Sequence, residues 1–276
     1  MHQPPRPGSQ ADAGRRLCLR AGLGALAATA LPPTWALAPS SAPATRPLRA
    51  VGTQFARLFE GAEGRAPQGL AVELLQQLFG RDGVRCEWMP WSRALLMVET
   101  GEADLLVGPY LTADRETRLR FSARSFYSDP MVWFVRRGEE ARWRGELEDL
   151  RHARVAAVRG WAYGSRFDRM KWLADSMSWV SSVDAGLQML ARQRVDLFAA
   201  NERNCRPVLE QLRLTQALSA CSPPLDVLHG HMAFARSAVG EALAQRYDQA
   251  FEAWSRRPGA AELYRRWGVD KPPGLR

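Results

Sequence analysis

Hydroxyl groups and a guanidinium follow a short apolar run in the stretch GEADLLVGPYLTADRETRLRFS. Leu105-Leu106-Val107 is an apolar run, which predicts that residues 103–107 form a strand buried inside a parallel sheet. Gly108, Tyr110, Thr112 and Arg115 come next in the chain. Open α/β sheets bind ligands beyond the carboxyl ends of their strands. The sequence therefore predicts that these four residues face a ligand-binding crevice.

Arg115 has the most specific chemistry of the four. A guanidinium holds a carboxylate with two parallel hydrogen bonds, which a lysine cannot imitate. The residues also permit an ordinary surface ion pair of Arg115 with Glu116 or Asp114. From the residues alone, both interpretations stay open.

Motifs of enzymes and metal centres are missing from the sequence. There is no Gly-x-Ser-x-Gly elbow, no glycine-rich phosphate loop and no His-Glu-x-x-His pair. His229 and His231 are the only close histidine pair, and two ligands without a third make a poor metal site. We therefore expect no metal and no cofactor.

The elements that must position these residues alternate along the chain. Alternating strands and helices predict an α/β fold with an open sheet. The expected strands are 48–53, 84–88, 103–107, 154–158, 195–199 and 231–235, and the expected helices are 69–79, 92–99, 182–191, 207–212, 239–254 and 259–267. Ser92 is expected to cap the second of these helices.

The first 38 residues have the pattern of an export signal. Arg15-Arg16 precedes an uncharged run that ends at Leu31, and Ala36-Leu37-Ala38 offers a small-x-small cleavage site. The paired arginines resemble a twin-arginine signal, and cleavage is expected between residues 36 and 44. Loss of residues 1–38 lowers the net charge from +9 to +6. The remaining charges alternate in sign, which argues against a nucleic-acid partner.

Export to the periplasm would leave three cysteines in an oxidising compartment. Cys205 and Cys221 bracket an expected helix, and we predict that they form a disulfide. Cys86 lies in an alternating strand, where a buried, reduced thiol is expected.

Several stretches together resemble the extracellular solute-binding proteins of family 3. They are Gly69-Leu-Ala-Val-Glu-Leu-Leu, Ala94–Leu106, Thr112-Ala-Asp-Arg115 and Phe121-Ser122, and the resemblance runs from about Leu48 to Gly268. The resemblance implies a periplasmic-binding-protein-like fold, in which two α/β lobes are joined by two crossing hinge strands and close around a small ligand. It also implies that Arg115 holds the ligand's α-carboxylate.

Two segments suit the crossing strands that this family implies. Asp129–Arg137 is an apolar run that ends in charge, and Ser222–Leu228 begins with a turn. We therefore place lobe 1 at residues 48–132 plus 228–276, and lobe 2 at residues 133–227.

The second lobe departs from the family at one position. In relatives, an acidic residue after the Val-Asp strand receives the ligand's ammonium, and the corresponding position here is Asn201, with Glu202 beside it. An amide accepts a hydrogen bond but cannot neutralise a cation. An α-amino acid ligand is therefore in question unless Glu202 or Asp168 turns inward.

Aromatic side chains complete the expected site. Trp161 and Tyr163 follow the strand 154–158 and would face the cleft from lobe 2, while Phe55 and Trp91 are the candidates on lobe 1. Packing inside a lobe is the alternative for each of them.

The expected function is capture of an amino acid or related small carboxylate in the periplasm for uptake by an ABC transporter. We expect a monomer that is not an enzyme, with an ABC permease as its partner. Two alternatives stay open: a dehydratase-like enzyme of the same fold, and a binding protein that serves a sensor.

Overall fold

The computed structural model describes residues 46–168 and 177–275. The predicted export signal, with its cleavage site, lies outside the described residues. Among the described residues, no helix has both the length and the apolar character needed to cross a membrane.

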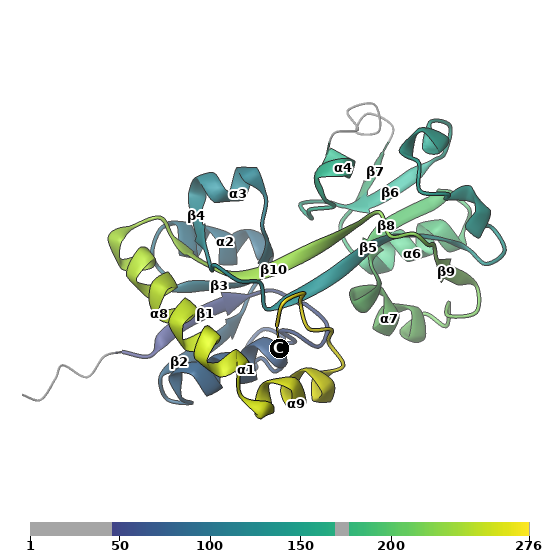
Figure 1. Ribbon diagram of the computed structural model, residues 1–276. Coiled ribbons are helices and arrows are strands. Elements are labelled where there is room, and N and C mark those ends of the chain that lie inside the picture. Colours follow the sequence, from purple (N-terminus) through teal and green to yellow (C-terminus); the bar gives the residue numbers. More distant parts are fainter. Residues whose placement is uncertain (1–45, 169–176, 276) are drawn as a thin grey trace, which may run out of the picture. The chain divides into compact units, whose positions relative to one another are not determined.

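In the part of the chain that the structure describes, ten strands form one sheet, whose main path runs β2-β1-β3-β10-β5-β8-β6-β7 (Figure 1). β4 joins at β10 and β9 joins at β5. The strands are β1 (Leu48–Gly52), β2 (Val84–Trp88), β3 (Leu105–Tyr110), β4 (Leu119–Phe121), β5 (Tyr127–Arg136), β6 (Val155–Val158), β7 (Ser178–Val180), β8 (Leu197–Asn201), β9 (Leu218–Ala220) and β10 (Asp226–Ala235).

Two long strands join the two halves of this sheet. β5 and β10 pair antiparallel from Tyr127 opposite Gly230 to Met131 opposite Asp226. β10 then continues along β3 and β4, whereas β5 continues along β8 and β9. Each strand therefore belongs to both halves, which makes them the two crossing strands of a two-lobed α/β fold (Figure 1).

Helices cover both halves of the sheet. In the first half, α1 (Leu70–Phe79), α2 (Trp91–Glu99), α3 (Ala113–Arg118), α8 (Ala238–Ser255) and α9 (Pro258–Trp267) surround β1–β4. In the second half lie α4 (Ser165–Asp168), α6 (Val183–Ala191), α7 (Glu202–Gln211) and two 3₁₀ turns, Glu140–Arg142 and Leu147–Leu150.

Apolar side chains on each face of each half form separate cores. On β5, Met131 and Trp133 pack on one face, and Val132 and Phe134 pack on the other, as the two-residue period of a strand requires. The described residues nevertheless belong to one compact unit, so the lobe limits 48–132 plus 228–276 and 133–227 stay a prediction.

Every expected helix and strand is present, but several ends differ. α2 begins at Trp91, one residue before the predicted cap Ser92, because Pro90 takes the cap position and no side chain caps the helix. α7 begins at Glu202 and contains Pro207 in its interior, whereas we expected a start at Pro207. The side chain of Asn201 caps α7 by accepting a hydrogen bond from the Asn204 N–H, and this cap fixes the earlier start.

β3 runs three residues further than the expected end at Val107. Two of its residues, Gly108 and Pro109, lie opposite a single residue of β10, which is a β-bulge. Gly108 has φ +78°, a conformation that glycine adopts without strain. The bulge lets the strand resume pairing at Tyr110, opposite Gly230. Tyr110 therefore lies inside the sheet and not in a loop beyond it.

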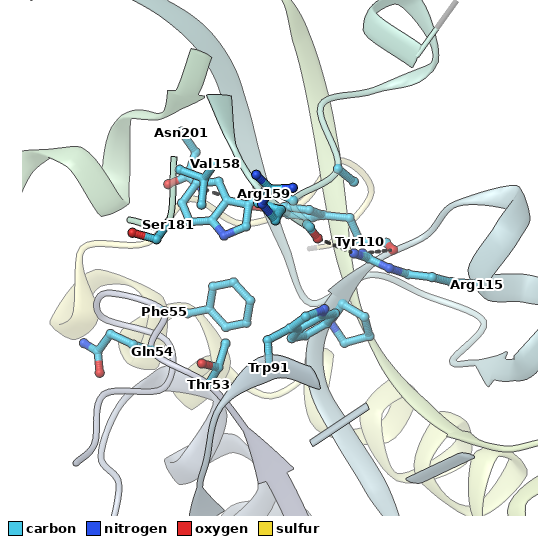
Figure 2. A pocket seen from close by; sticks show the side chains of 15 residues that line it. Thr53, Gln54, Phe55, Trp91, Tyr110, Arg115, Val158, Arg159, Ser181 and Asn201 are labelled. Atoms are coloured by element: carbon cyan, nitrogen blue, oxygen red, sulfur yellow. Dashed lines mark hydrogen bonds between the residues drawn. The ribbon is translucent and has the colours of Figure 1, made fainter. Parts of the chain in front are cut away.

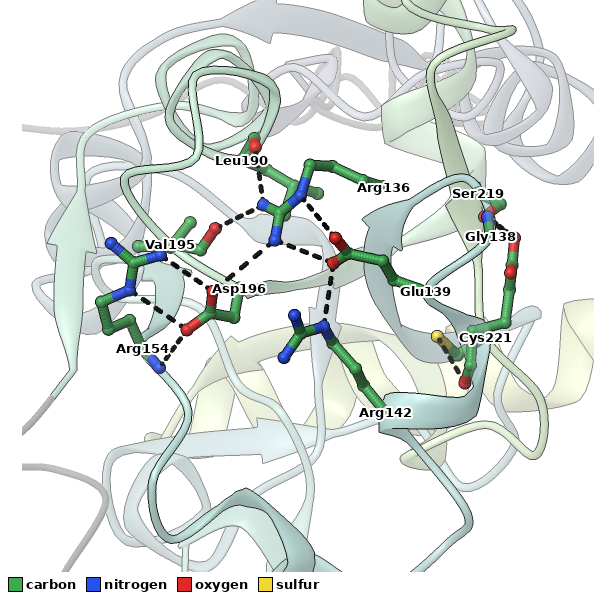
Figure 3. Close-up of polar contacts among 11 residues, drawn as sticks. Arg136, Gly138, Glu139, Arg142, Arg154, Leu190, Val195, Asp196, Ser219 and Cys221 are labelled. Atoms are coloured by element: carbon green, nitrogen blue, oxygen red, sulfur yellow. Dashed lines mark hydrogen bonds and ion pairs between the residues drawn. The ribbon is translucent and has the colours of Figure 1, made fainter.

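The predicted Cys205–Cys221 disulfide is wrong, because both thiols are free. Cys205 packs in the core on one face of the second half of the sheet, with Val132 and Phe134. Cys221 packs on the other face, where its thiol lies 3.9 Å from the carbonyl oxygen of Glu140 (Figure 3). The sheet separates the two sulfurs. Cys86, also free, is partly buried, and burial raises the pKa of its thiol to about 12.

Ion pairs hold the outer end of the second half together, away from the site described below. Arg136 donates to the carbonyl oxygens of Leu190 and Val195 and pairs with Glu139 (Figure 3). Asp196 accepts from both the backbone and the side chain of Arg154, and hydrogen bonding by that side chain lowers the pKa of Asp196 to about 2. Arg136 and Arg154 therefore make contacts within the fold and lie outside the site.

Candidate functional site

A cavity of about 230 Å³ lies between the two lobes, beside the crossing strands. Its described lining comes from the ends of five strands (β1, β3, β6, β7 and β8) and the turns that follow them, together with α2 and α3 (Figure 2). The lining residues are Thr53, Gln54, Phe55, Trp91, Gly108, Pro109, Tyr110, Arg115, Val158, Arg159, Gly160, Trp161, Ala162, Ser181 and Asn201.

Two aromatic rings form the lobe 1 wall. Phe55 follows β1, and its ring meets Trp91 at the start of α2 edge to face, with centroids 6.3 Å apart. The guanidinium carbon of Arg115 lies 5.0 Å from the centroid of the Trp91 ring, which is cation–π distance. Trp91 therefore supports Arg115 from one side.

Arg115 projects from the short helix α3 into this cavity (Figure 2). Its Nη1 donates to the carbonyl oxygen of Tyr110 at 3.1 Å, and its Nη2 lies 3.4 Å from the carbonyl oxygen of Gly160 in the other lobe. Burial lowers the pKa of Arg115. Among the described residues, no carboxylate lies within 4.0 Å of its guanidinium. The surface pair of Arg115 with Asp114 or Glu116, which the residues alone left open as an alternative, is therefore not formed, and Asp114 pairs with Arg118.

A turn after β6 forms the lobe 2 wall. The N–H of Arg159 donates to the carbonyl oxygen of Val180 at 2.9 Å, which anchors the turn to the neighbouring strand β7. Gly160, with φ +78°, reverses the chain, and Trp161 follows it, partly exposed to the cavity. Ser181, just after β7, is exposed beside them (Figure 2).

Asn201 lies at the junction of β8 and α7 and is 1% exposed. Its Oδ1 accepts the N–H of Asn204 at 2.8 Å, and its Nδ2 donates to the hydroxyl oxygen of Tyr110 at 3.2 Å. Both ends of the amide are thus engaged. The side chain of Asn201 therefore holds a helix end and a tyrosine.

A buried ion pair lies behind the cavity, at the crossing strands. Arg203 contacts Asp129 through Nε at 2.9 Å and Nη2 at 2.5 Å, and their side chains are 10% and 3% exposed. The Tyr110 hydroxyl donates to the same carboxylate at 2.6 Å. Burial lowers the pKa of Arg203, but attraction and hydrogen bonding to Asp129 outweigh burial and raise it above its ordinary value. We call Tyr110, Asp129, Asn201 and Arg203 the hinge network.

The hinge network also connects α7 to the loop after β1. Arg203 donates to the carbonyl oxygen of Ala56, and Asn204 Oδ1 accepts the N–H of Ala56 at 2.9 Å. Both backbone groups of Ala56 are therefore held by side chains of the opposite lobe.

Seven of the ten predicted site residues line the cavity: Phe55, Trp91, Gly108, Tyr110, Arg115, Trp161 and Asn201. Thr112 instead caps α3, where its hydroxyl accepts the N–H of Arg115 at 3.3 Å. Tyr163 is 1% exposed and stacks on Phe167 at 4.7 Å inside lobe 2. Glu202 pairs with Arg206 at 3.6 Å, away from the cavity. The side chain of Asp168 lies outside the described residues.

Sequence reasoning missed several lining residues, including Thr53, Gln54, Arg159 and Ser181. Each directly follows a strand or lies one or two residues beyond it, so the rule that identified Arg115 could have found them. Arg159 is the most informative of these, because it brings a second positive charge to the cavity. The described part of the lining contains two arginines and no aspartate or glutamate.

The sequence matches the bacterial extracellular solute-binding proteins of family 3 over residues 53–270, and the chain belongs to that family. No match to a curated protein was found.

Solved structures share the fold at low sequence identity. A histidine kinase sensor domain with similarity to periplasmic binding proteins is 19% identical, with a TM-score of 0.71 over 82% of this chain and 98% of its own. The arginine-, lysine-, histidine-binding protein ArtJ from Geobacillus stearothermophilus is 17% identical, with a TM-score of 0.65 over 82% and 97%. A transporter substrate-binding protein from Streptococcus pneumoniae with bound histidine is 15% identical, with a TM-score of 0.64 over 81% and 94%.

Proposed function

We propose that this protein binds a small carboxylate, an amino acid or a related acid, in the cavity between its lobes. The observation that carries the proposal is Arg115, a partly buried cation in the cavity with no carboxylate partner among the described residues. Removing a cation from water without a counter-ion is costly, and a ligand carboxylate would repay that cost through two charge-assisted hydrogen bonds. Phe55, Trp91 and Trp161 would enclose the ligand's apolar part.

Uptake is the physiological role that the family favours. We propose that the protein is exported to the periplasm and works there as a monomer that delivers its ligand to an ABC permease. Closure of the lobes over the ligand would generate the surface that the permease recognises.

A thermal-shift screen tests the binding proposal. The screen uses amino acids and simple carboxylates, each beside the corresponding amide or alcohol. A ligand present at a hundred times its Kd adds about 2.7 kcal/mol to the free energy of unfolding. We expect carboxylates to raise the melting temperature and their neutral counterparts to leave it unchanged. Equal stabilisation by a carboxylate and its amide would contradict the role of Arg115.

A sensory role is the second candidate, because one solved structure with this fold is a histidine kinase sensor domain. The two roles differ in what happens to the ligand in cells. If the protein serves a permease, deletion of its gene should abolish uptake of the radiolabelled ligand. If it serves a sensor, uptake should continue while the ligand's effect on gene expression is lost.

Enzyme activity is the less favoured alternative. Among the described residues that line the cavity, none is a histidine, aspartate or glutamate that could act as a general acid. Incubation with cyclic carboxylates, followed by NMR of the mixture, would reveal a dehydratase by the appearance of a new double bond.

A further inference from the structure

The charge of the cavity points to a more specific class of ligand. Two arginines, Arg115 and Arg159, line it, and none of the described lining residues is acidic. A monocarboxylate would neutralise one positive charge and leave the other. A zwitterionic amino acid would add an ammonium to a cavity that already has an excess of positive charge.

Arg159 is placed to act on a ligand and not on the protein. Its backbone is fixed by the hydrogen bond to Val180, whereas its side chain is exposed and has no ion pair among the described residues. It precedes Gly160, whose carbonyl oxygen lies 3.4 Å from Nη2 of Arg115. The two arginines therefore approach the cavity from neighbouring points on opposite lobes (Figure 2).

The same cavity offers an ammonium little to bind. The Tyr110 hydroxyl donates to Asp129, and the amide oxygen of Asn201 accepts from the backbone of α7. Asp129 itself is 2% exposed and held by Arg203. The amide oxygen of Gln54 accepts the N–H of Gly61 at 3.1 Å. Among the side-chain oxygens of the described lining residues, those of Thr53 and Ser181 are left, and these are neutral and cannot balance a charge.

We infer that the ligand is a small dicarboxylate without an amine, and that Arg159 binds its second carboxylate. This inference rests on the proposed function, in which Arg115 binds the first carboxylate. Binding would then join the lobes through the ligand, since Arg115 belongs to lobe 1 and Arg159 to lobe 2. Each arginine would gain the counter-ion that it lacks among the described residues.

Calorimetry with matched acids tests the inference. The probes are succinate and glutarate, the monocarboxylates butyrate and valerate, and the aminated diacids aspartate and glutamate. Because a hydrogen bond between charged groups contributes roughly 1.5–3 kcal/mol, we expect a diacid to bind about tenfold to a hundredfold more tightly than its monocarboxylate. We expect a similar preference for each diacid over its aminated form.

Two variants distinguish a specific contact of Arg159 with the ligand from a general effect of removing one positive charge. Arg159→Gln should lower diacid affinity to that of the monocarboxylate and leave the monocarboxylate unaffected. Arg192→Gln is the matched control, because Arg192 is an exposed arginine of the same lobe that follows the far end of α6. It should change neither affinity. Circular dichroism melting checks that both variants fold.

The outcomes distinguish this inference from the proposed function. Binding of monocarboxylates or amino acids at least as tight as that of diacids would overturn the inference and leave the proposed function intact. An unchanged diacid preference in Arg159→Gln would overturn the role of Arg159. If none of these acids binds, nor any carboxylate in the thermal-shift screen, both proposals are wrong.

Discussion

Two arginines near the middle of the molecule differ in what surrounds them. Arg203 lies in the hinge network, where Asp129 supplies a bidentate counter-ion and the Tyr127 ring lies 5.4 Å from the guanidinium carbon. Arg115 lies in the cavity, where its contacts are two carbonyl oxygens and the ring of Trp91. The protein environment raises the pKa of Arg203 and lowers that of Arg115.

This difference separates an arginine that maintains structure from one suited to bind a ligand. A buried cation that is paired with a carboxylate of the protein is already neutralised, so it gains little from a ligand anion, and the pair is costly to break. A partly buried cation without one gains free energy when an anion arrives. Each of the following predictions tests one side of this comparison.

The largest effect on stability is expected for Asp129→Ala. Breaking a buried pair by removing one partner leaves a buried charge uncompensated, which typically costs about 3–5 kcal/mol. Urea unfolding should show a loss of this size. The control is Glu262→Ala, which removes an exposed partner of Arg265 and should have little effect. A loss no larger than that of the control would show that the hinge pair does not stabilise the fold.

For Arg115→Ala we expect the opposite result. Stability should change little, because no ion pair of Arg115 is lost among the described residues. Affinity for carboxylates should fall by about 2–5 kcal/mol, since the ligand anion would be desolvated without a partner. Arg115→Lys should recover little of it, because an ammonium lacks the two-pronged geometry. Calorimetry measures both variants, and undiminished carboxylate affinity in Arg115→Ala would exclude Arg115 as the anchor.

The comparison also shows what the sequence could reveal. The position of Arg115 followed from an apolar strand and the rule that ligands bind beyond strand ends. The hinge pair could not be found in this way, because Asp129 and Arg203 are 74 residues apart and become partners only when β5 pairs with β8. Neither residue has a local pattern that distinguishes it from a surface charge.

Local sequence patterns were also insufficient to predict features that depend on how the sheet is assembled. The spacing of Cys205 and Cys221 fits a disulfide, but spacing does not reveal on which face of a sheet each residue packs. Tyr110 was expected to offer its hydroxyl to a ligand, and the bulge at Gly108 and Pro109 directs it instead to Asp129. The fold could be predicted because its periodic patterns repeat along the sequence. These details could not, because each depends on a single contact between distant segments.

Tyr110→Phe tests whether the Tyr110 hydroxyl stabilises the hinge network or binds the ligand. The ring lines the cavity, but the hydroxyl donates to Asp129 and accepts from Asn201. Loss of a hydrogen bond to a charged group should lower the free energy of unfolding by about 1.5–3 kcal/mol. Ligand affinity should be nearly unchanged, because the ring stays. A large loss of affinity in calorimetry, with normal stability, would instead place the hydroxyl in the ligand site.

Asn201→Asp should lower stability by less than Asp129→Ala does, because aspartate keeps the contact that caps α7. Aspartate caps a helix as well as asparagine does, so the bond to the Asn204 N–H should persist. The bond that Nδ2 donates to Tyr110 is lost, and a carboxylate replaces a neutral amide at a position that is 1% exposed, so we expect a loss of about 1–3 kcal/mol.

The new carboxylate of Asn201→Asp would face a cavity with two arginines and no acid among its described lining residues. It should offer an ammonium the partner that the natural chain lacks there. We expect the ratio of glutamate to glutarate affinity to rise by about tenfold, as one charge-assisted hydrogen bond would provide. Asn201→Ser, which keeps a capping oxygen without charge, is the control and should leave the ratio unchanged. If the ratio in Asn201→Asp equals that of the control, position 201 does not govern amine selectivity.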